Sequence, residues 1–182
     1  MARTQVLHVD DDPAFTELTV DMLERQEDQF TVETAHSASE GLELLAGGGF
    51  DCIVSDYDMP GRNGLEFLEV IREQFPDLPF ILFTGKGSEE VASDAISAGI
   101  TDYLQKGGGT ERYELLANRI ETAVRQYRAE RELERQNDLF AKAQDIASVG
   151  AWEYNTRTGD SYASEQVLRM HGLDPDDAIT PE

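Results

Sequence analysis

The stretch Asp51-Cys-Ile-Val-Ser-Asp56-Tyr-Asp-Met-Pro-Gly-Arg-Asn-Gly64 decides the fold class. Residues 51–55 are mostly apolar or small, which is typical of a strand buried on both faces. Asp56 interrupts this run, and the Pro-Gly pair that follows marks a loop. Residues 63–74 then carry apolar side chains at helical spacing. A buried strand that passes through a loop into an amphipathic helix is the repeating unit of a parallel α/β sheet.

This strand–loop–helix unit recurs over the first two thirds of the chain. The expected strands are residues 4–9, 30–34, 51–55, 79–83 and 101–105, and the expected helices are residues 13–26, 38–46, 63–74 and 89–98 and one that begins near Thr110. Helices between strands are the usual crossover connections of a parallel sheet. The predicted fold is therefore α/β, a doubly wound five-stranded parallel sheet with helices on both faces and ligands at the carboxyl ends of the strands.

The composition limits the kinds of partner. Asp and Glu number 37 against 15 Lys and Arg, which gives a formal net charge of −22 at pH 7. Such a surface repels nucleic acid and anionic membranes, so neither is expected as a direct partner. An excess of carboxylates with scarce lysine resembles haloarchaeal proteins, since high salt screens the self-repulsion of such a surface. We therefore expect a halophilic protein.

Cysteine content and hydropathy exclude further classes. Cys52 is the one cysteine, so an internal disulfide and a cysteine-rich zinc site are excluded, and Cys52 is expected to be a small buried strand residue. No apolar run approaches the roughly 18 residues of a membrane span, and the first residues lack the apolar core of a signal peptide. We expect a cytoplasmic protein.

Polar side chains follow four of the five expected strands. Asp10-Asp11-Asp12 comes after the first strand, Asp56 after the third, Thr84 at the end of the fourth and Lys106 after the fifth. The carboxyl ends of parallel strands meet at one edge of a sheet, so these groups are expected in one pocket.

The chemistry of this pocket suits phosphoryl transfer to a carboxylate. Crowded carboxylates repel one another and need a hard divalent cation such as Mg²⁺, which takes carboxylates, waters and phosphate oxygens. With the ion in place Asp56 can attack phosphorus and form an acyl phosphate. Lys106 and Thr84 are then expected to stabilise the phosphoryl oxygens. Asp12 extends the acidic run, but an Asp before Pro13 is typical of a helix N-cap.

Four motifs resemble the receiver domain of two-component response regulators, namely Asp10-Asp11, Asp56-Tyr-Asp-Met-Pro-Gly-Arg-Asn-Gly64, Thr84-Gly85 and Asp102-Tyr-Leu-Gln-Lys106. The resemblance covers residues 3–125 and is specific, because the order, spacing and strand placement of the motifs agree. It implies a flavodoxin-like fold and a role in a phosphorelay. The implied partner is a sensor histidine kinase or a phosphotransfer protein. The implied output is a switch of the two loops after the fourth and fifth strands, passed on through the C-terminal helix.

The same resemblance implies a role for each site residue. Asp56 is the phosphoacceptor that becomes 4-aspartylphosphate, with slow self-dephosphorylation and no conventional turnover. Thr84 and Tyr103 form a switch pair, and Lys106 contacts the phosphate. Asp11 binds Mg²⁺ directly and Asp10 mostly through water. The full set of implied metal ligands is Asp10, Asp11, Asp56 and the backbone carbonyl of Asp58.

One position departs from the family pattern. Receivers usually have Pro directly after the lysine, often with a cis bond, whereas Lys106 is followed by Gly107-Gly108-Gly109. Three glycines give this loop more backbone freedom, which leaves phosphorylation intact but affects the rigidity of the output face. Asp58 and Lys86, each two residues after a site residue, are expected to tune water access to the acyl phosphate.

The last third of the chain predicts a long helix and the start of a second domain. The helix that begins near Thr110 is expected to continue to residue 147, with Glu132 spaced to pair with Arg128 and Arg135. Residues 140–182 resemble the beginning of a PAS sensor domain, from which no ligand is inferred. The expected boundaries are 1–122 for the receiver domain, 123–147 for the linker helix and 148–182 for the partial PAS-like segment.

The PAS-like segment predicts a small α+β arrangement. Residues 150–154 and 161–163 are expected to be short strands and residues 164–171 a helix. Trp152 and Tyr154 are expected to be packing residues.

Two other functions fit part of the pattern. Asp56-Tyr-Asp58 also resembles the Asp-x-Asp of haloacid-dehalogenase-type phosphatases, whose first Asp is the nucleophile and whose second is the acid/base. The nucleophile of that family normally follows the first strand, so the order here favours the receiver. A receiver-like interaction module with an inert pocket is the third alternative. The polar part of the linker helix is expected to be a solvated single helix. The alternative is a homodimer, through the linker helix, where Leu133 alone supports a coiled-coil seam, or through the face made by the fourth helix, fifth strand and fifth helix.

Overall fold

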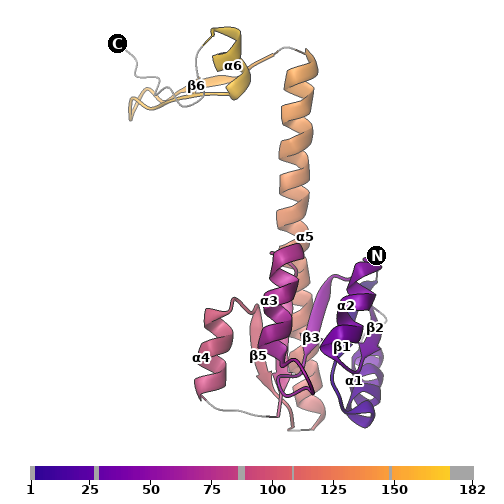
Figure 1. Cartoon of the computed structure of the whole chain (residues 1–182). Helices are drawn as coiled ribbons and strands as arrows, with labels where there is room; N and C mark the ends of the chain where they lie inside the picture. Colours follow the sequence, from indigo (N-terminus) through magenta and orange to yellow (C-terminus); the bar gives the residue numbers. More distant parts are fainter. Residues whose placement is uncertain (1–2, 27–28, 86–88, 108, 148, 173–182) are drawn as a thin grey trace. The chain divides into compact units, whose positions relative to one another are not determined.

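The computed structural model describes residues 3–26, 29–85, 89–107, 109–147 and 149–172 (Figure 1). The chain forms two compact units, residues 1–129 and residues 130–182. The strands of the first unit are β1 (Thr4–Val9), β2 (Phe30–Ala35), β3 (Cys52–Ser55), β4 (Phe80–Thr84) and β5 (Asp102–Gln105). They form one sheet in the order β2-β1-β3-β4-β5, and every pairing is parallel.

The helices between and after these strands are α1 (Pro13–Gln26), α2 (Ala38–Ala46), α3 (Gly64–Gln74), α4 (Glu89–Ser97) and α5 (Thr110–Ala147). The doubly wound fold predicted from the sequence is confirmed. Each predicted end of an element in the first unit lies within one residue of the observed end. The single long helix from Thr110 is confirmed as α5.

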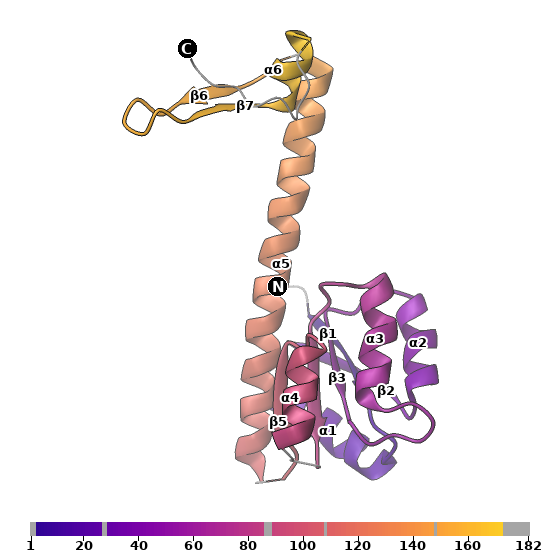
Figure 2. The same cartoon turned by 60° about the vertical axis from the view of Figure 1, so that its left-hand side comes forward.

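Helices cover both faces of the sheet (Figures 1 and 2). The core on the side of α1 and α5 includes Val6, Cys52, Val54, Ile81, Phe83, Leu23, Leu116, Ile120 and Val124. The core on the side of α2, α3 and α4 includes Leu7, Val9, Ile53, Phe80, Leu82, Phe67, Leu68, Ile71 and Ala95. Alternate strand residues point to opposite faces, and here both faces are buried. This explains why the central strands are almost continuously apolar.

Side-chain caps start two helices close to the carboxyl edge of the sheet. Asp12 Oδ1 accepts hydrogen bonds from the backbone N–H groups of Ala14, at 2.9 Å, and Phe15, at 3.2 Å. The predicted N-cap role of Asp12 is thereby confirmed. Asn63 and Glu66 form a reciprocal capping box at the start of α3.

α5 changes character along its length. Its first part packs on the sheet through Leu116, Ile120 and Val124, whereas every residue from 128 to 143 is exposed. Glu132 pairs with Arg135 at 2.9 Å, as the spacing predicts. Arg128 instead binds Asp51, just before β3, with Nη2 and Oδ2 2.6 Å apart.

The second unit contains two short strands and a short helix beyond the end of α5. β6 (Trp152–Tyr154) and β7 (Ser161–Ala163) pair antiparallel, and α6 (Glu165–Met170) follows. Trp152 and Tyr154 are 73% and 46% exposed, so the prediction that they are packing residues is wrong for this structure. The hairpin pairs only with itself in the described part of this unit, where Ser164 and Leu168 alone are buried, so no core covers the two aromatic rings.

Hydropathy gives one further result. None of the helices in the described ranges combines the length and apolar character needed to span a lipid bilayer.

Gly64, the first residue of α3, lies tightly against the chain that follows β3. A Cβ atom at this position would overlap the backbone carbonyl oxygen of Asp56, and it would lie 3.0 Å from Leu82 Cδ1 and 3.1 Å from Tyr57 Cα. Gly64→Ala is therefore expected to lower the free energy of unfolding by about 2 kcal/mol, because backbone rather than a flexible side chain must move. Urea unfolding followed by circular dichroism measures the change.

Gly85→Ala is the matched control, since nothing lies within 4 Å of a Cβ added there. Its unfolding midpoint should stay close to that of the wild type. Equal losses of stability in both variants would contradict the steric explanation.

Candidate functional site

At the carboxyl edge of the sheet, the residues just after the strands keep the backbone hydrogen bonds of the parallel ladders. The N–H of Asp10, after β1, donates to Ala35 O at 3.0 Å, and the N–H of Asp56, after β3, donates to Val9 O at 2.8 Å. The N–H of Lys106, after β5, donates to Thr84 O at 2.8 Å. The main chain therefore fixes where each of these side chains begins.

Lys106, which follows β5, contacts the carboxylates that follow β1 and β3. Its Nζ lies 2.6 Å from Asp10 Oδ2 and 2.9 Å from Asp56 Oδ2. It also lies 4.4 Å from the centre of the Phe15 ring, at cation–π distance. Burial disfavours the ammonium ion, but hydrogen bonds to Asp10 and Asp56 outweigh burial and raise the pKa of Lys106. The lysine is thus a fixed cation of the pocket.

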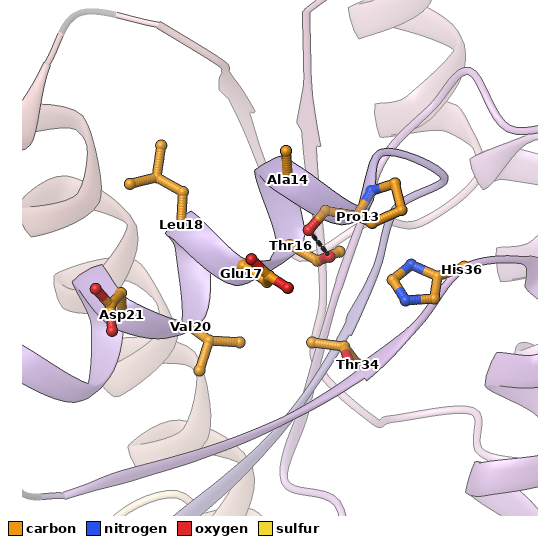
Figure 3. A pocket seen from close by; sticks show the side chains of 9 residues that line it. All are labelled: Pro13, Ala14, Thr16, Glu17, Leu18, Val20, Asp21, Thr34 and His36. Carbon is orange, nitrogen blue, oxygen red and sulfur yellow. Dashed lines mark hydrogen bonds between the residues drawn. The ribbon is translucent and has the colours of Figure 1, made fainter.

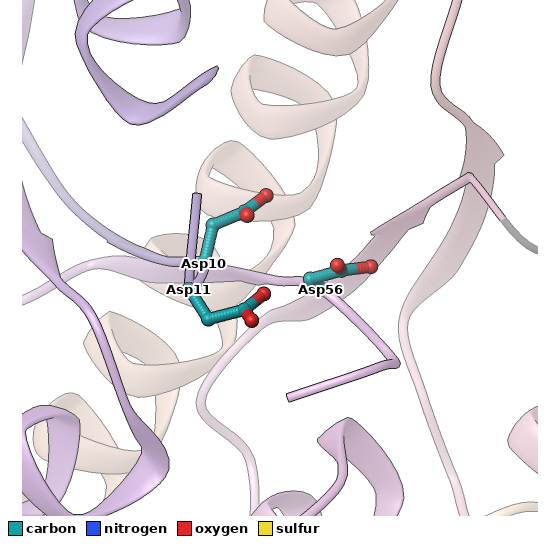
Figure 4. Close-up of side chains that lie close together, drawn as sticks. All are labelled: Asp10, Asp11 and Asp56. Atoms are coloured by element: carbon teal, nitrogen blue, oxygen red, sulfur yellow. The ribbon is translucent and has the colours of Figure 1, made fainter. Parts of the chain in front are cut away.

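Three carboxylates lie close together (Figure 4), and two of them are the ones that Lys106 contacts. Asp10, Asp11 and Asp56 each place one oxygen within 4.8 Å of the others. Asp10 and Asp56 are buried and Asp11 is exposed. Burial raises the pKa of Asp10, while its hydrogen bond with Lys106 acts in the opposite direction.

The donor set fits a small hard cation. Mg²⁺ binds oxygen at about 2.1 Å in an octahedron, so its own ligand oxygens are about 3 to 4 Å apart. Carboxylate oxygens within 4.8 Å need only a small closure to reach that spacing. The exposed carboxylate of Asp11 leaves one side of the cluster open to water, which Mg²⁺ usually keeps.

The other predicted site residues lie around this cluster. Thr84, the last residue of β4, is buried, and Tyr103 on β5 is half-buried. Tyr103 is in register with Leu82, and Thr84 with Gln105, so both predicted switch residues lie on the sheet face covered by α4.

The residues predicted to tune water access, Asp58 and Lys86, are described only in part. Asp58 is exposed, and Lys86 lies outside the described residues. Gly107 and Gly109 have φ angles of +99° and +72°, which an L side chain rarely adopts. Gly107 and Gly109 are therefore used for their backbone conformation.

Sequence reasoning missed two residues of the site. Phe15 of α1 lies under Lys106, and the rings of Phe15 and His8 are 6.2 Å apart. His8 is fully buried in β1, and burial lowers its pKa to about 3, so the ring is neutral at pH 7. A histidine between the apolar residues Leu7 and Val9 was the available signal, but it indicates no role by itself.

A separate groove of about 690 Å³ lies between α1 and the end of β2 (Figure 3). It is lined by Pro13, Ala14, Thr16, Glu17, Leu18, Val20, Asp21, Thr34 and His36. None of the predicted site residues lines it. The hydroxyl of Thr16 donates to Pro13 O at 2.8 Å and is thus used within α1.

The family described as the response regulator receiver domain matches residues 6–118. This chain belongs to that family. Its members accept phosphoryl groups from histidine kinases and generally bind Mg²⁺ at an acidic pocket. The match includes Asp10, Asp56, Thr84 and Lys106 of the cluster described above.

Curated relatives are regulatory proteins. The transcriptional regulatory protein FixJ of Bradyrhizobium diazoefficiens is 34% identical over 140 residues, which cover 77% of this chain and 63% of FixJ. The response regulator protein FleR of Pseudomonas aeruginosa is 37% identical over 102 residues, which cover 56% of this chain and 21% of FleR. The chain thus spans between a fifth and two thirds of the length of these relatives.

Solved structures confirm the flavodoxin-like receiver fold. A CheY-like receiver domain protein from Methanospirillum hungatei has a TM-score of 0.63 at 29% identity and covers 71% of this chain and 99% of that chain. The beryllofluoride-activated NtrC4 receiver domain dimer has a TM-score of 0.60 at 32% identity, covering 68% of this chain and 98% of that chain.

Removal of the bridging lysine tests the electrostatics of the cluster. Lys106→Met leaves the carboxylates of Asp10 and Asp56 without their cation, and losing one partner of a buried ion pair is strongly destabilising. The Lys106 side chain is 16% exposed, so we expect the free energy of unfolding at pH 7 to fall by the lower end of the usual cost, about 3 kcal/mol, in urea titrations.

Lys142→Met, on the exposed part of α5, is the matched control and should change stability by less than about 0.5 kcal/mol. A Lys106→Met protein as stable as this control would show that the ion pairs contribute nothing to the fold.

Proposed function

We propose that this chain is a phosphorelay receiver that accepts a phosphoryl group on Asp56 from a sensor histidine kinase or phosphotransfer protein. The observation that carries the proposal is the position of Lys106 Nζ, within 3 Å of both Asp10 and Asp56, beside a third carboxylate on Asp11. Family membership supports the same reaction.

The transfer step uses the groups at the edge of the sheet. A carboxylate oxygen of Asp56 attacks the phosphorus of a phosphohistidine, the O–P bond forms as the P–N bond breaks, and the imidazole nitrogen keeps the electron pair. Lys106 and Thr84 then bind phosphoryl oxygens. Mg²⁺ supplies positive charge that offsets the crowded oxygens. Its proposed ligands are Asp10, Asp11, Asp56 and the carbonyl of Asp58.

Phosphorylation is proposed to change the loops after β4 and β5. The new oxygens draw the hydroxyl of Thr84 toward Asp56, and Tyr103, on the same sheet face, follows into the space beside α4. Gly107 and Gly109, with positive φ, give the loop after β5 a backbone unlike that of receivers with Pro after the lysine. The signal then passes along α5.

We propose three regions for the chain. Residues 1–122 form the receiver domain, 123–147 the linker helix and 148–182 the beginning of a PAS-like segment. The order of two short strands and a helix after α5 supports the last assignment. The net charge of −22 supports a halophilic protein, because salt shortens the range of repulsion to about 3 Å at 1 M.

We also propose that two copies pair, through α5 or through the face made by α4, β5 and α5. Leu133 and Phe140 lie seven residues apart on α5 and are 59% and 63% exposed. Apolar residues at this spacing form the seam of a parallel coiled coil. The related beryllofluoride-activated NtrC4 receiver domain, which is a dimer in solution, supports pairing of receivers in general.

Phosphorylation of Asp56 is tested with acetyl phosphate and Mg²⁺ in molar KCl. Intact-mass spectrometry should detect an alkali-labile phosphoryl adduct in the wild type and none in Asp56→Ala. Asp51→Asn, at the other end of β3, is the matched control and should be modified as the wild type is.

Each alternative function has its own result. Absence of an adduct in folded wild-type protein, with either acetyl phosphate or a phosphorylated histidine donor, would favour an inert interaction module. Repeated turnover of p-nitrophenyl phosphate, lost in Asp58→Asn, would favour the phosphatase.

Pairing through parallel α5 helices is tested by cysteine cross-linking. Cys52 is fully buried, so an introduced cysteine is the reactive thiol. Leu133→Cys should form a disulfide-linked dimer under mild oxidation if parallel α5 helices pair in register, whereas Asp138→Cys, on the outer side of such a pair, should not. A dimer by light scattering without a Leu133→Cys cross-link would exclude the parallel, in-register α5 pair.

A further inference from the structure

His8 is a buried polar side chain that the proposed phosphoryl transfer does not use. It lies in β1 with 0% of its surface exposed. Neither ring nitrogen has a hydrogen-bond partner within the described part of the chain. An unpaired buried polar group destabilises a fold, and an apolar β-branched residue would fill a strand position without that cost. The imidazole is therefore expected to do something that an apolar side chain cannot.

His8 points toward the acidic cluster. Its Nε2 lies 3.9 Å from Asp10 Oδ2, which is longer than a hydrogen bond. The same oxygen is bound by Lys106 Nζ at 2.6 Å. Asp10 Oδ2 thus contacts the Lys106 ammonium group, and the neutral His8 ring would need to move only about 1 Å closer to form a hydrogen bond with the same oxygen.

The other neighbours of the ring give it no hydrogen bond within the described ranges. The Phe15 ring lies 6.2 Å from that of His8, centre to centre, and the register neighbours of His8 are Val54 on β3 and Thr34 on β2. A neutral imidazole carries one N–H and one acceptor nitrogen. Placing the proton on Nε2 points the donor at the carboxylate.

We propose that His8 is a positioning residue for Asp10, whose Oδ2 accepts a hydrogen bond from His8 Nε2–H whenever Lys106 releases that oxygen. Phosphoryl oxygens on Asp56 would draw Lys106 away from Asp10, because ammonium–phosphate contacts are strong. The fully buried Asp10 carboxylate then keeps a donor and its orientation toward the metal. Only this releasing event rests on the proposed function; the hydrogen bond itself is testable without phosphorylation.

The direct test is nitrogen-15 NMR of the histidine rings in the full chain, with the His8 signal assigned from its absence in His8→Phe. The wild type should show the neutral Nε2–H tautomer. In Lys106→Met, without any phosphoryl donor, the Nε2–H proton should move downfield and exchange more slowly with water. An Nδ1–H tautomer, or a His8 signal that is the same in both proteins, would overturn the proposal.

Mg²⁺ titration by calorimetry separates positioning from packing. In the Lys106→Met background, adding His8→Phe should weaken Mg²⁺ binding about tenfold, as loss of a partner that orients a metal ligand does. His8→Gln should restore most of the affinity, because its amide nitrogen can replace Nε2 as donor. With Lys106 present, His8→Phe should change Mg²⁺ affinity little. An equal effect in both backgrounds, or no rescue by Gln, would contradict the proposal.

The same NMR measurement on wild-type protein treated with acetyl phosphate tests whether phosphorylation causes the release of Asp10 by Lys106. A downfield His8 Nε2–H signal that appears together with the phosphoryl adduct would support both the proposed function and the role of His8. If the signal moves in Lys106→Met but no adduct forms in the wild type, the proposed function fails and the role of His8 stands. If the adduct forms with Lys106 still on Asp10 and the His8 signal unmoved, the role of His8 fails.

Discussion

The contacts of Lys106 Nζ with Asp10 Oδ2, at 2.6 Å, and Asp56 Oδ2, at 2.9 Å, connect the ends of β1, β3 and β5. The rest of the site depends on them. Two carboxylates this close repel each other strongly in a buried setting, so the lysine allows both to stay at one edge of the sheet. In the proposed phosphoryl transfer the same contacts would limit reactivity, because Lys106 would exchange one carboxylate for phosphoryl oxygens when charge is added to Asp56.

Backbone and apolar groups prepare this arrangement. The strand ladders end in the N–H groups of Asp10, Asp56 and Lys106, so the three side chains start from fixed positions. Phe15, held in the first turn of α1 by the Asp12 cap, places its ring against Lys106. The pocket is thus ordered by the packing of the sheet and helices.

Much of this could be predicted from the sequence, and the limits have physical causes. The ends of the strands are predictable because Asp56 and Lys106 interrupt apolar runs, and a parallel topology brings such interruptions to one edge of the sheet. The Asp12 cap is predictable because it depends only on residues two and three positions further along the chain. Helical spacing predicts Glu132 as the partner of Arg128, but it describes only neighbours on one helix. It could not find the observed partner, Asp51, which is 77 residues away in the sequence. The large apolar ring of Trp152 predicts packing, but burial also needs a covering element. His8 and Asp10 are two residues apart, so strand alternation places both on one face. The competition of His8 with Lys106 for Asp10 Oδ2, at 3.9 Å and 2.6 Å, depends on a contact from another strand that no spacing rule contains.

Asp51 and Asp56 stand at opposite ends of β3, one before its first residue and one after its last. Asp51 Oδ2 accepts from the N–H of Gln5, at the start of β1, and both of its oxygens accept from Arg128. The Arg128 side chain is partly exposed, and exposed ion pairs contribute about 1 kcal/mol or less and weaken in salt. In concentrated salt the Arg128–Asp51 ion pair is therefore expected to break easily. The pair of Arg119 on α5 with Asp102 on β5, at 3.1 Å, is also partly exposed and weakens in salt as well. What holds α5 on the sheet without regard to salt is its apolar stripe, Leu116, Ile120 and Val124, whose packing requires no single direction.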